Sequence, residues 1–335
     1  MTTLETDHIV RPIPTTNEPS RRAAIERKLR IINLFTVIVP FLGLAAAIAL
    51  LWGVAFHWIY PVMLGCMIVL TSLGVTVGFH RLCTHKSFTS PAWVRYIFAA
   101  AGSMAVQGPV IWWCAEHRRH HQHSDTEHDP HSPHMGLDGS WGEGLIATIR
   151  GAFHAHMGWL LSAKTQNLSK YTKDLRQDKV VVTVSKQFVP WVVIGFAIPA
   201  IVGALVTWSW MGLLLGFLWG GLVRVLLVHH LTWSVNSVCH LWGSRPFSSR
   251  DESRNNPIVG VLGFGEGWHN NHHAFPTSAR HGLFWWQLDI SYMVIRGLQF
   301  VGLARDVRVP DRARIQAKRR KNPQSHLATP LDDAD

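Results

Sequence analysis

The stretch IINLFTVIVPFLGLAAAIALL, residues 31–51, decides the fold of this chain, because it runs for a full membrane thickness without a charged residue. A helix needs about 20 mainly apolar residues to cross the hydrocarbon core of a bilayer. Three further runs reach that length, at residues 56–79, 188–208 and 211–231. We therefore predict an all-α integral-membrane protein with four transmembrane helices in two hairpins.

The composition and the placement of charge agree with a membrane protein. Of the 335 residues, 47% are hydrophobic and 16% charged, and the formal net charge is +11. Such a charge could indicate nucleic-acid binding, but Lys and Arg gather at 21–30 before the first span and are absent from the turns at 52–55 and 209–210. Positive residues mark the cytoplasmic side. We predict a multi-pass cell-membrane protein with both termini and the histidine motifs in the cytoplasm, and no nucleic-acid partner.

This interpretation divides the chain into three parts. Residues 1–30 form a cytoplasmic N-terminal tail, 31–305 the membrane domain, and 306–335 a basic C-terminal tail. The basic stretch at 312–321 either contacts anionic lipid headgroups or is a solvated tail. The sequence favours neither alternative.

Histidines gather in four motifs near the predicted spans: HRLCTH (80–85), HRRHH (117–121), NSVCH (236–240) and HNNHH (269–273). Residues at i, i+3 and i+4 share one face of a helix, so the second and the last motif each present three imidazoles together. His80 and His85 are five residues apart, which is ~140° around an α-helix, so they need a helix end or separate metals. Neutral imidazole is the commonest protein ligand for transition metals, and nine of them predict two metals close together.

Carboxylates are nearly absent from these motifs. Soluble di-iron bundles use Glu with Glu-x-x-His ligands, and that pattern does not fit here. Glu116 directly precedes HRRHH, and Glu266 lies three residues before HNNHH. We expect both to orient histidine N–H groups, with surface ion pairs as the alternative.

The remaining histidines receive other interpretations. Four histidines follow HRRHH and either support the metal ligands from behind or lie at the surface, which we favour: His123, His128, His131 and His134. Ionisable groups inside a span usually face the interior of a helix bundle or a cavity, because facing lipid is costly. We expect that orientation for His229, His230 and Arg224, which lie in the fourth predicted span.

The motifs HRLCTH, HRRHH and HNNHH, with NSVCH and GFGEGWHNNHH, resemble those of the integral-membrane fatty acid desaturases, and most of all the acyl-CoA Δ9 (stearoyl-CoA) branch. The resemblance covers residues 60–305 and implies four transmembrane helices, a cytosolic helical cap that carries the motifs, and a centre of two iron ions. Motif by motif, it implies as metal ligands His80, His85, His117, His120, His121, His240, His269, His272 and His273, with Asn236 acting through water.

The resemblance also implies an enzyme, an acyl-CoA desaturase, that uses O2 and the Fe2+/Fe3+ couple to place a double bond at the Δ9 position. Acyl-CoA, or another acyl carrier, would deliver the chain. The sequence shows no His-Pro-Gly-Gly haem motif and no flavin- or NAD-binding unit. We therefore expect a separate electron donor, such as a ferredoxin or rubredoxin with a reductase.

Six residues near the motifs are candidates for substrate binding: Trp112, Trp113, Trp233, Arg118, Arg119 and Lys164. The tryptophans would wall an apolar tunnel for the acyl chain, or would anchor helices at the membrane interface. The cations would meet coenzyme A phosphates, or would be ordinary positive-inside charges. Animal acyl-CoA desaturases have an Arg-Asp pair before the second motif, and this chain has Ala115 and Glu116 there, which leaves the carrier open.

Two other functions compete with desaturation. A membrane hydroxylase or monooxygenase uses similar histidine motifs, and only its product separates it from a desaturase. A metal-binding membrane transporter would thread ionisable residues through several spans, whereas these histidines gather beyond the span ends. We favour the desaturase.

Overall fold

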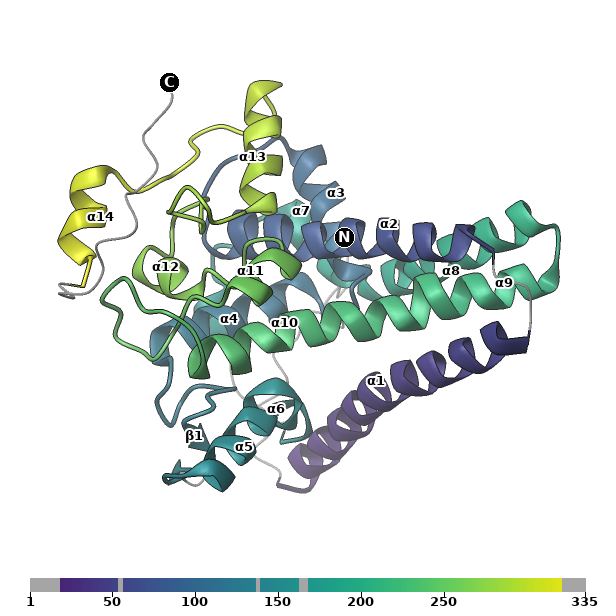
Figure 1. Cartoon of the computed structure of the whole chain (residues 1–335), viewed down its shortest axis with the longest axis horizontal. Helices are drawn as coiled ribbons and strands as arrows, with labels where there is room; N and C mark the ends of the chain where they lie inside the picture. The colour runs from purple at the N-terminus through teal and green to yellow at the C-terminus, as the bar shows by residue number, and fades with distance from the viewer. Residues whose placement is uncertain (1–18, 54–56, 137–138, 163–167, 321–335) are drawn as a thin grey trace, which may run out of the picture. The chain divides into compact units, whose positions relative to one another are not determined.

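The computed structural model describes residues 19–53, 57–136, 139–162 and 168–320. The chain forms two compact units. The first comprises residues 1–74, 99–116 and 159–228, and the second comprises 75–98, 117–158 and 229–335. Within the described ranges the only strands are the two-residue β1 (Met135–Gly136) and β2 (Gly139–Ser140), and nearly everything else that is regular is helical (Figure 1).

The helices are distributed over both units. The first unit holds α1 (Pro19–Gly53), α2 (Ile59–Leu73), α6 (Trp159–Leu161), η3 (Ser169–Tyr171), α7 (Lys179–Lys186), α8 (Phe188–Thr207), α9 (Trp210–Gly216) and η4 (Phe217–Val223). The second holds η1 (Gly74–Thr84) from its second residue on, α5 (Leu145–Phe153), η2 (His154–Gly158), α11 (Pro257–Leu262), α12 (His269–Ala274), α13 (Ile290–Phe300) and α14 (Arg312–Lys318). Besides η1, three helices of the described part contribute residues to both units: α3 (Ala92–Ser103), α4 (Val110–His123) and α10 (Arg224–Leu241).

Four helices in the described part are long and apolar enough to cross a membrane: Ala23–Leu50, Ile59–Thr84, Phe188–Thr207 and Trp210–Leu241. They overlap the four predicted spans, the first of which begins at Ala23 instead of residue 31, and the all-α membrane fold is confirmed. The second and the fourth end at Thr84 and Leu241 instead of 79 and 231. The difference arises because both helices continue beyond their apolar residues into a histidine motif.

Small residues let α8 and α9 pack closely in the first unit. A Cβ atom at Gly203 would lie 2.2 Å from the carbonyl oxygen of Gly212, and one at Gly216 would lie 2.2 Å from that of Pro199. Only glycine permits this approach, and such contacts are typical of membrane helix pairs. Between the two helices Trp208 adopts a left-handed conformation (φ 47°), which reverses the chain within two residues.

Arg224 is fully buried in the first unit, as expected for a cation inside a span. Its guanidinium donates to three backbone carbonyl oxygens: those of Met104, of Gly195 at 3.1 Å and of Gly220 at 3.2 Å. Pro199 lacks the N–H that would bond the Gly195 carbonyl four residues earlier, and Met104 directly follows α3, whose last carbonyls lack helical partners. Arg224 therefore satisfies backbone groups that lipid could not.

The second unit has its own apolar core, which includes part of the predicted basic tail. Six buried residues form this core: Phe247, Ala274, Phe275, Leu283, Phe284 and Ile315. Ile315 belongs to α14, whose N-terminus is capped by the Asp311 carboxylate accepting from the Arg314 N–H at 2.7 Å. The basic stretch is thus folded onto the second unit as far as residue 320.

Candidate metal centre

Helix η1 brings His80 and His85 to the same place. It is a π-helix, in which hydrogen bonds join residues i and i+5. The His85 N–H donates to the His80 carbonyl at 3.1 Å, and the Thr84 hydroxyl donates to the Phe79 carbonyl at 2.8 Å. Residues five apart therefore lie above one another here, and His85 directly follows the last helical residue, Thr84.

Helices α4, α10 and α12 carry the other seven histidines. All nine histidines belong to the second unit. The nine imidazoles form two groups, in each of which the possible ligand atoms lie within 4.8 Å of one another. The first group, called here the five-histidine cluster, is His80, His85, His117, His121 and His272. The second, called the four-histidine cluster, is His120, His240, His269 and His273.

The ring nitrogens within each cluster point at one another. In the five-histidine cluster, four contacts join successive Nε2 atoms: His85–His117 at 3.1 Å, His117–His121 at 3.0 Å, His121–His272 at 2.9 Å and His272–His80 at 3.0 Å. In the four-histidine cluster the Nε2 atoms of His240 and His269 are 3.0 Å apart. Converging lone pairs repel one another unless a proton or a cation lies between them, so this arrangement suits a metal ion in each cluster.

Four buried carboxylates bind the opposite side of four of these rings. Each lies against an Nδ1 atom: Glu266 against His80 at 2.5 Å, Asp129 against His120 at 3.0 Å, Asp125 against His240 at 2.8 Å and Asp251 against His273 at 2.5 Å. A carboxylate that accepts the Nδ1–H leaves the Nε2 lone pair directed into the cluster, as around metal-binding histidines. The Nε2 atoms of His120 and His273 are buried without a hydrogen-bond partner in the described structure, which again suits a metal.

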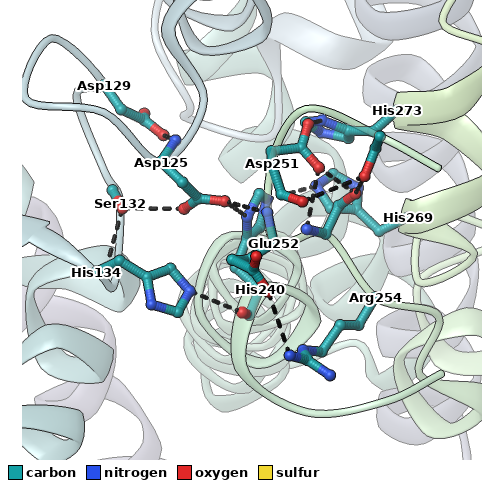
Figure 2. Close-up of polar contacts among 12 residues, drawn as sticks. Asp125, Asp129, Ser132, His134, His240, Asp251, Glu252, Arg254, His269 and His273 are labelled. Atoms are coloured by element: carbon teal, nitrogen blue, oxygen red, sulfur yellow. Dashed lines mark hydrogen bonds and ion pairs between the residues drawn. The ribbon is translucent and has the colours of Figure 1, made fainter. Parts of the chain in front are cut away.

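The carboxylates are themselves held in place, as Figure 2 shows for Asp125. Asp125 accepts from the Ser132 hydroxyl at 2.9 Å and from the Glu252 N–H at 2.8 Å. The His134 Nε2 lies 3.0 Å from the His240 carbonyl oxygen, and Ser132 receives the His134 N–H (Figure 2). The loop after α4 therefore fixes His240 from two sides.

A charged network lies behind the five-histidine cluster. The fully buried Arg81 contacts Glu266 at 2.8 Å, Asp289 at 3.1 Å and the His281 Nδ1 at 2.9 Å. The ring of His281 lies 4.4 Å from that of His272, centre to centre. The two carboxylates balance Arg81 and the neighbouring imidazoles, which makes burial of the guanidinium tolerable.

Protonation in the site favours metal binding. Burial, reinforced by the neighbouring imidazoles, lowers the pKa of five histidines well below its ordinary value: His85, His117, His121, His269 and His272. These rings are neutral at pH 7, the form that binds a metal. Burial alone would raise the pKa of Asp129, but the adjacent His120 outweighs burial and holds that pKa below its usual range. His273 has the same effect on the pKa of Asp251.

Comparison with known proteins identifies the family. The fatty acid desaturase family model matches residues 57–296, more than two thirds of the chain. The chain belongs to the fatty acid desaturase family. The chain is 43% identical over 282 residues to the hex-5-enoyl-[acyl-carrier protein] acetylenase of Moorena producens, a match that covers 84% of this chain and 87% of that protein.

Two other relatives act on differently attached acyl chains, according to their names. The sn-1 stearoyl-lipid 9-desaturase of Anabaena variabilis is 40% identical over 242 residues, 72% of this chain and 80% of the relative. The acyl-CoA C20 Delta5-desaturase of Anemone leveillei is 36% identical over 301 residues, 88% of this chain and 87% of the relative.

The structure places the other sequence-predicted residues as follows. Asn236 lies on α10, one helical turn before His240, and is half-buried. Glu266 contacts His80, as described above, whereas Glu116 lies half-buried on α4 in the first unit. Lys164 lies outside the described residues.

Two predicted substrate-binding cations have backbone partners. Arg118 donates three hydrogen bonds to the carbonyl oxygens of Cys83 and Thr84, at 2.8–3.0 Å, and so fixes the end of η1. Arg119 donates to the His128 carbonyl at 3.0 Å. These contacts give both residues a structural role near the site. Their predicted contact with coenzyme A phosphates stays a prediction.

The three candidate tunnel tryptophans lie in different surroundings. In the first unit, Trp112 stacks on Trp159 with ring centres 6.4 Å apart, and the Trp113 Nε1–H donates to the Gln107 side chain at 3.1 Å. In the second unit Trp233 is buried and packs against His156, with ring centres 5.8 Å apart. No tunnel wall follows from these contacts alone, so that role also stays a prediction.

Sequence reasoning missed several residues of the site. His131, for which we favoured a surface position, is only 6% exposed, and its ring is tilted against the ring of His120 with ring centres 4.5 Å apart. The expectation was wrong because the loop after α4 folds back over the cluster. Asp125 and Asp129 alternate with histidines in SDTEHDPH, a pattern that could have marked them. Asp251 and His281 carry no such local signal, because their partners are distant in sequence.

Proposed function

We propose that this desaturase introduces a double bond into a saturated fatty acyl chain with O2, at a centre of two iron ions. The reaction converts –CH2–CH2–, O2, two electrons and two protons into –CH=CH– and two water molecules. When bound, the iron ions supply the reduction of O2 and the oxidation of an unactivated C–H bond. The observation that carries the proposal is the pair of buried histidine clusters, each with converging Nε2 atoms and four of the rings backed by carboxylates.

The nine histidines would hold the two metals, one in each cluster. Asn236 would join the four-histidine cluster through a water molecule, because it lies one turn before His240 on α10. Imidazole suits iron, copper and zinc alike, so the choice of iron rests on the family resemblance rather than on the ligands. Asp125, Asp129, Asp251 and Glu266 would set the orientation and basicity of their histidines.

The protein itself binds the chain, orients it and excludes water. An unactivated methylene has no polar group, so the position of the double bond depends on how far an apolar channel admits the chain. We propose Trp112, Trp113 and Trp233 as walls of that channel. Glu116 would instead orient a histidine N–H of the second motif. Burial of His120, His240 and His272 to 2% exposure or less keeps solvent from the metals.

We propose that the acyl chain arrives as acyl-CoA and that the double bond forms at the Δ9 position. The relative from Anemone supports a CoA carrier by its name. Other relatives are named for a lipid and for an acyl carrier protein, and Ala115-Glu116 stands here in place of an Arg-Asp pair. The identity of the acyl carrier is therefore the first property to test. Arg118, Arg119 and Lys164 are the proposed contacts to CoA phosphates.

We also propose that residues 31–305 form the membrane desaturase domain, in the cell membrane, with the histidine clusters and both termini in the cytoplasm. The distribution of Lys and Arg supports this orientation. A ferredoxin or rubredoxin with a reductase would then supply electrons from the cytoplasm.

The test is expression in a host without its own desaturation, followed by mass spectrometry that locates any new double bond. Purified enzyme is then given acyl-CoA, acyl-lipid and acyl-carrier-protein substrates. A hydroxylated or acetylenic product would refute desaturation, and a product from lipid alone would refute the CoA carrier.

Two ligand variants test the metal assignment. His120→Ala and His272→Ala should each lose iron from one cluster and abolish product. His128→Ala is the matched control, because its side chain is 66% exposed and outside both clusters. Full iron content with retained desaturation in both ligand variants would refute the assignment.

A further inference from the structure

A basic groove lies in the second unit, beside the helix that carries the last histidine motif. The groove has a volume of about 330 Å³. One wall is the segment 274–278 that ends and follows α12, and the other is 307–310 with Arg314 and Lys318 of α14. Figure 1 shows α14 beside α12. Three exposed cations line the groove, Arg308, Arg314 and Lys318, and no carboxylate is among its lining residues.

The charge around the groove favours an acidic partner. Residues 305–320 contain seven Lys and Arg against two carboxylates, Asp306 and Asp311. Both carboxylates have partners within the chain, since Asp306 accepts from the Thr89 hydroxyl at 2.8 Å and Asp311 caps α14. A surface of one sign attracts an oppositely charged partner and speeds its encounter.

A bilayer is the poorer partner for this surface. A helix that lies on a membrane inserts large apolar side chains between the lipids. In α14 the large apolar residue is Ile315, which is 7% exposed and packs into the core with Phe247, Phe275 and Phe284. The exposed residues of α14 are Arg, Ala, Gln and Lys, so this helix offers a bilayer no large apolar side chain to insert.

The floor of the groove is directly connected to the four-histidine cluster. Ala274 and Phe275 follow His273 in the chain, and both line the groove. The Lys318 ammonium donates to the Ala274 carbonyl at 2.5 Å and lies over the Phe275 ring, 5.2 Å from its centre. An electron from a redox group held above this floor would have a short path to the four-histidine cluster, through packed and covalently linked atoms.

We propose that the basic groove is the docking surface for an acidic one-electron carrier protein. The inference rests on the proposed function, in which each turnover takes two electrons from outside the chain. The carrier would approach with its carboxylates against Arg308 and Arg314, and its redox group over Ala274 and Phe275. It would deliver one electron per encounter and leave oxidised, so two encounters serve one double bond.

The first test measures binding rather than activity. Metal-free desaturase in neutral-lipid nanodiscs is titrated with a plant-type [2Fe–2S] ferredoxin at low and at 0.5 M salt. The double variant Arg308→Glu/Arg314→Glu should bind about tenfold more weakly at low salt, and the difference should shrink at high salt. Arg296→Glu, an exposed charge reversal on α13 outside the groove, should bind like the unchanged protein. Equal affinity of the double variant would overturn the proposal.

Hydrogen exchange separates the carrier from lipid headgroups. Residues 307–318 should gain protection when ferredoxin is added, and not when neutral lipid is replaced by anionic lipid. Protection that follows the lipid and ignores ferredoxin would overturn the proposal. Product formation with dithionite and a viologen as electron source tests the proposed function separately, because the double variant should then equal the unchanged enzyme. Absence of product from both proteins with that reductant would instead count against the proposed function.

Discussion

At the residue scale, the histidines of the site are oriented by carboxylates that lie outside the histidine motifs. Asp129 contacts the His120 Nδ1 with both oxygens at 3.0 Å, and its side chain is fully buried. It also accepts the N–H groups of Asp125 and His131. One carboxylate therefore orients a predicted ligand and organises the loop that covers it.

Replacing Asp129 by Asn should weaken metal binding without removing a ligand. The amide keeps the size but loses the charge that makes His120 basic, and loss of such partners costs 10–100-fold in metal affinity. Competition with a chelator measures that affinity directly. Glu127→Gln is the matched control from the same loop, because its side chain is 69% exposed and its loss should leave affinity unchanged. An Asp129→Asn protein with unchanged affinity would show that the contact is only structural.

At the scale of elements, the spans were predictable and their ends were not. The apolar runs fixed four helices, because length and hydropathy alone determine what crosses a bilayer. The π-helix at 74–84 had no signal in the sequence that we could recognise, yet it brings His80 and His85 into one cluster. The i, i+3, i+4 spacing did predict the shared faces of α4 and α12, because there the helix is an ordinary α-helix.

Arg224 joins helices through backbone carbonyls that lack helical partners, at the end of α3 and before the proline in α8. Arg224→Leu should lower the thermal unfolding temperature clearly, because three buried carbonyls lose their donor at about 1–3 kcal/mol each. Arg224→Lys should recover only part of the loss, since one ammonium cannot reproduce the planar fork. Unfolding in detergent or nanodiscs measures both, with the exposed Arg296→Leu as control. Equal stability of Arg224→Leu would mean that other donors or water replace the guanidinium.

At the scale of the molecule, the sequence identifies the predicted metal ligands, and the structure adds the distant residues that contact them. The sequence identified the nine histidines, because ligand motifs are local in the chain. It could not identify Asp251 or His281, whose partners His273 and Arg81 lie 22 and 200 residues away. Nor could it show that 312–318 packs as a helix, since a single buried side chain, Ile315, decides that outcome.

The collection of so many neutral, buried imidazoles makes the stability of the metal-free molecule depend on pH. Burial lowers the pKa of His85, His117, His121, His269 and His272 in the folded state, whereas the unfolded chain titrates near ~6.5. Below that pH the unfolded state binds more protons than the folded one, so stability is present above it and is lost as the pH falls.

The unfolding temperature of metal-free protein should therefore drop steadily from pH 7.5 to pH 5.5. Above pH 7.5 these five histidines should no longer change the unfolding temperature, because they are neutral in both the folded and the unfolded state. The depressed pKa values of Asp129 and Asp251 add a further loss only below about pH 4, near the ordinary carboxyl range. Calorimetry of the metal-free enzyme in nanodiscs measures the curve, and His128→Ala, an exposed histidine, should leave its shape unchanged. A flat curve between pH 7.5 and 5.5 would mean that the clusters take up protons while folded, which converging buried Nε2 atoms should resist.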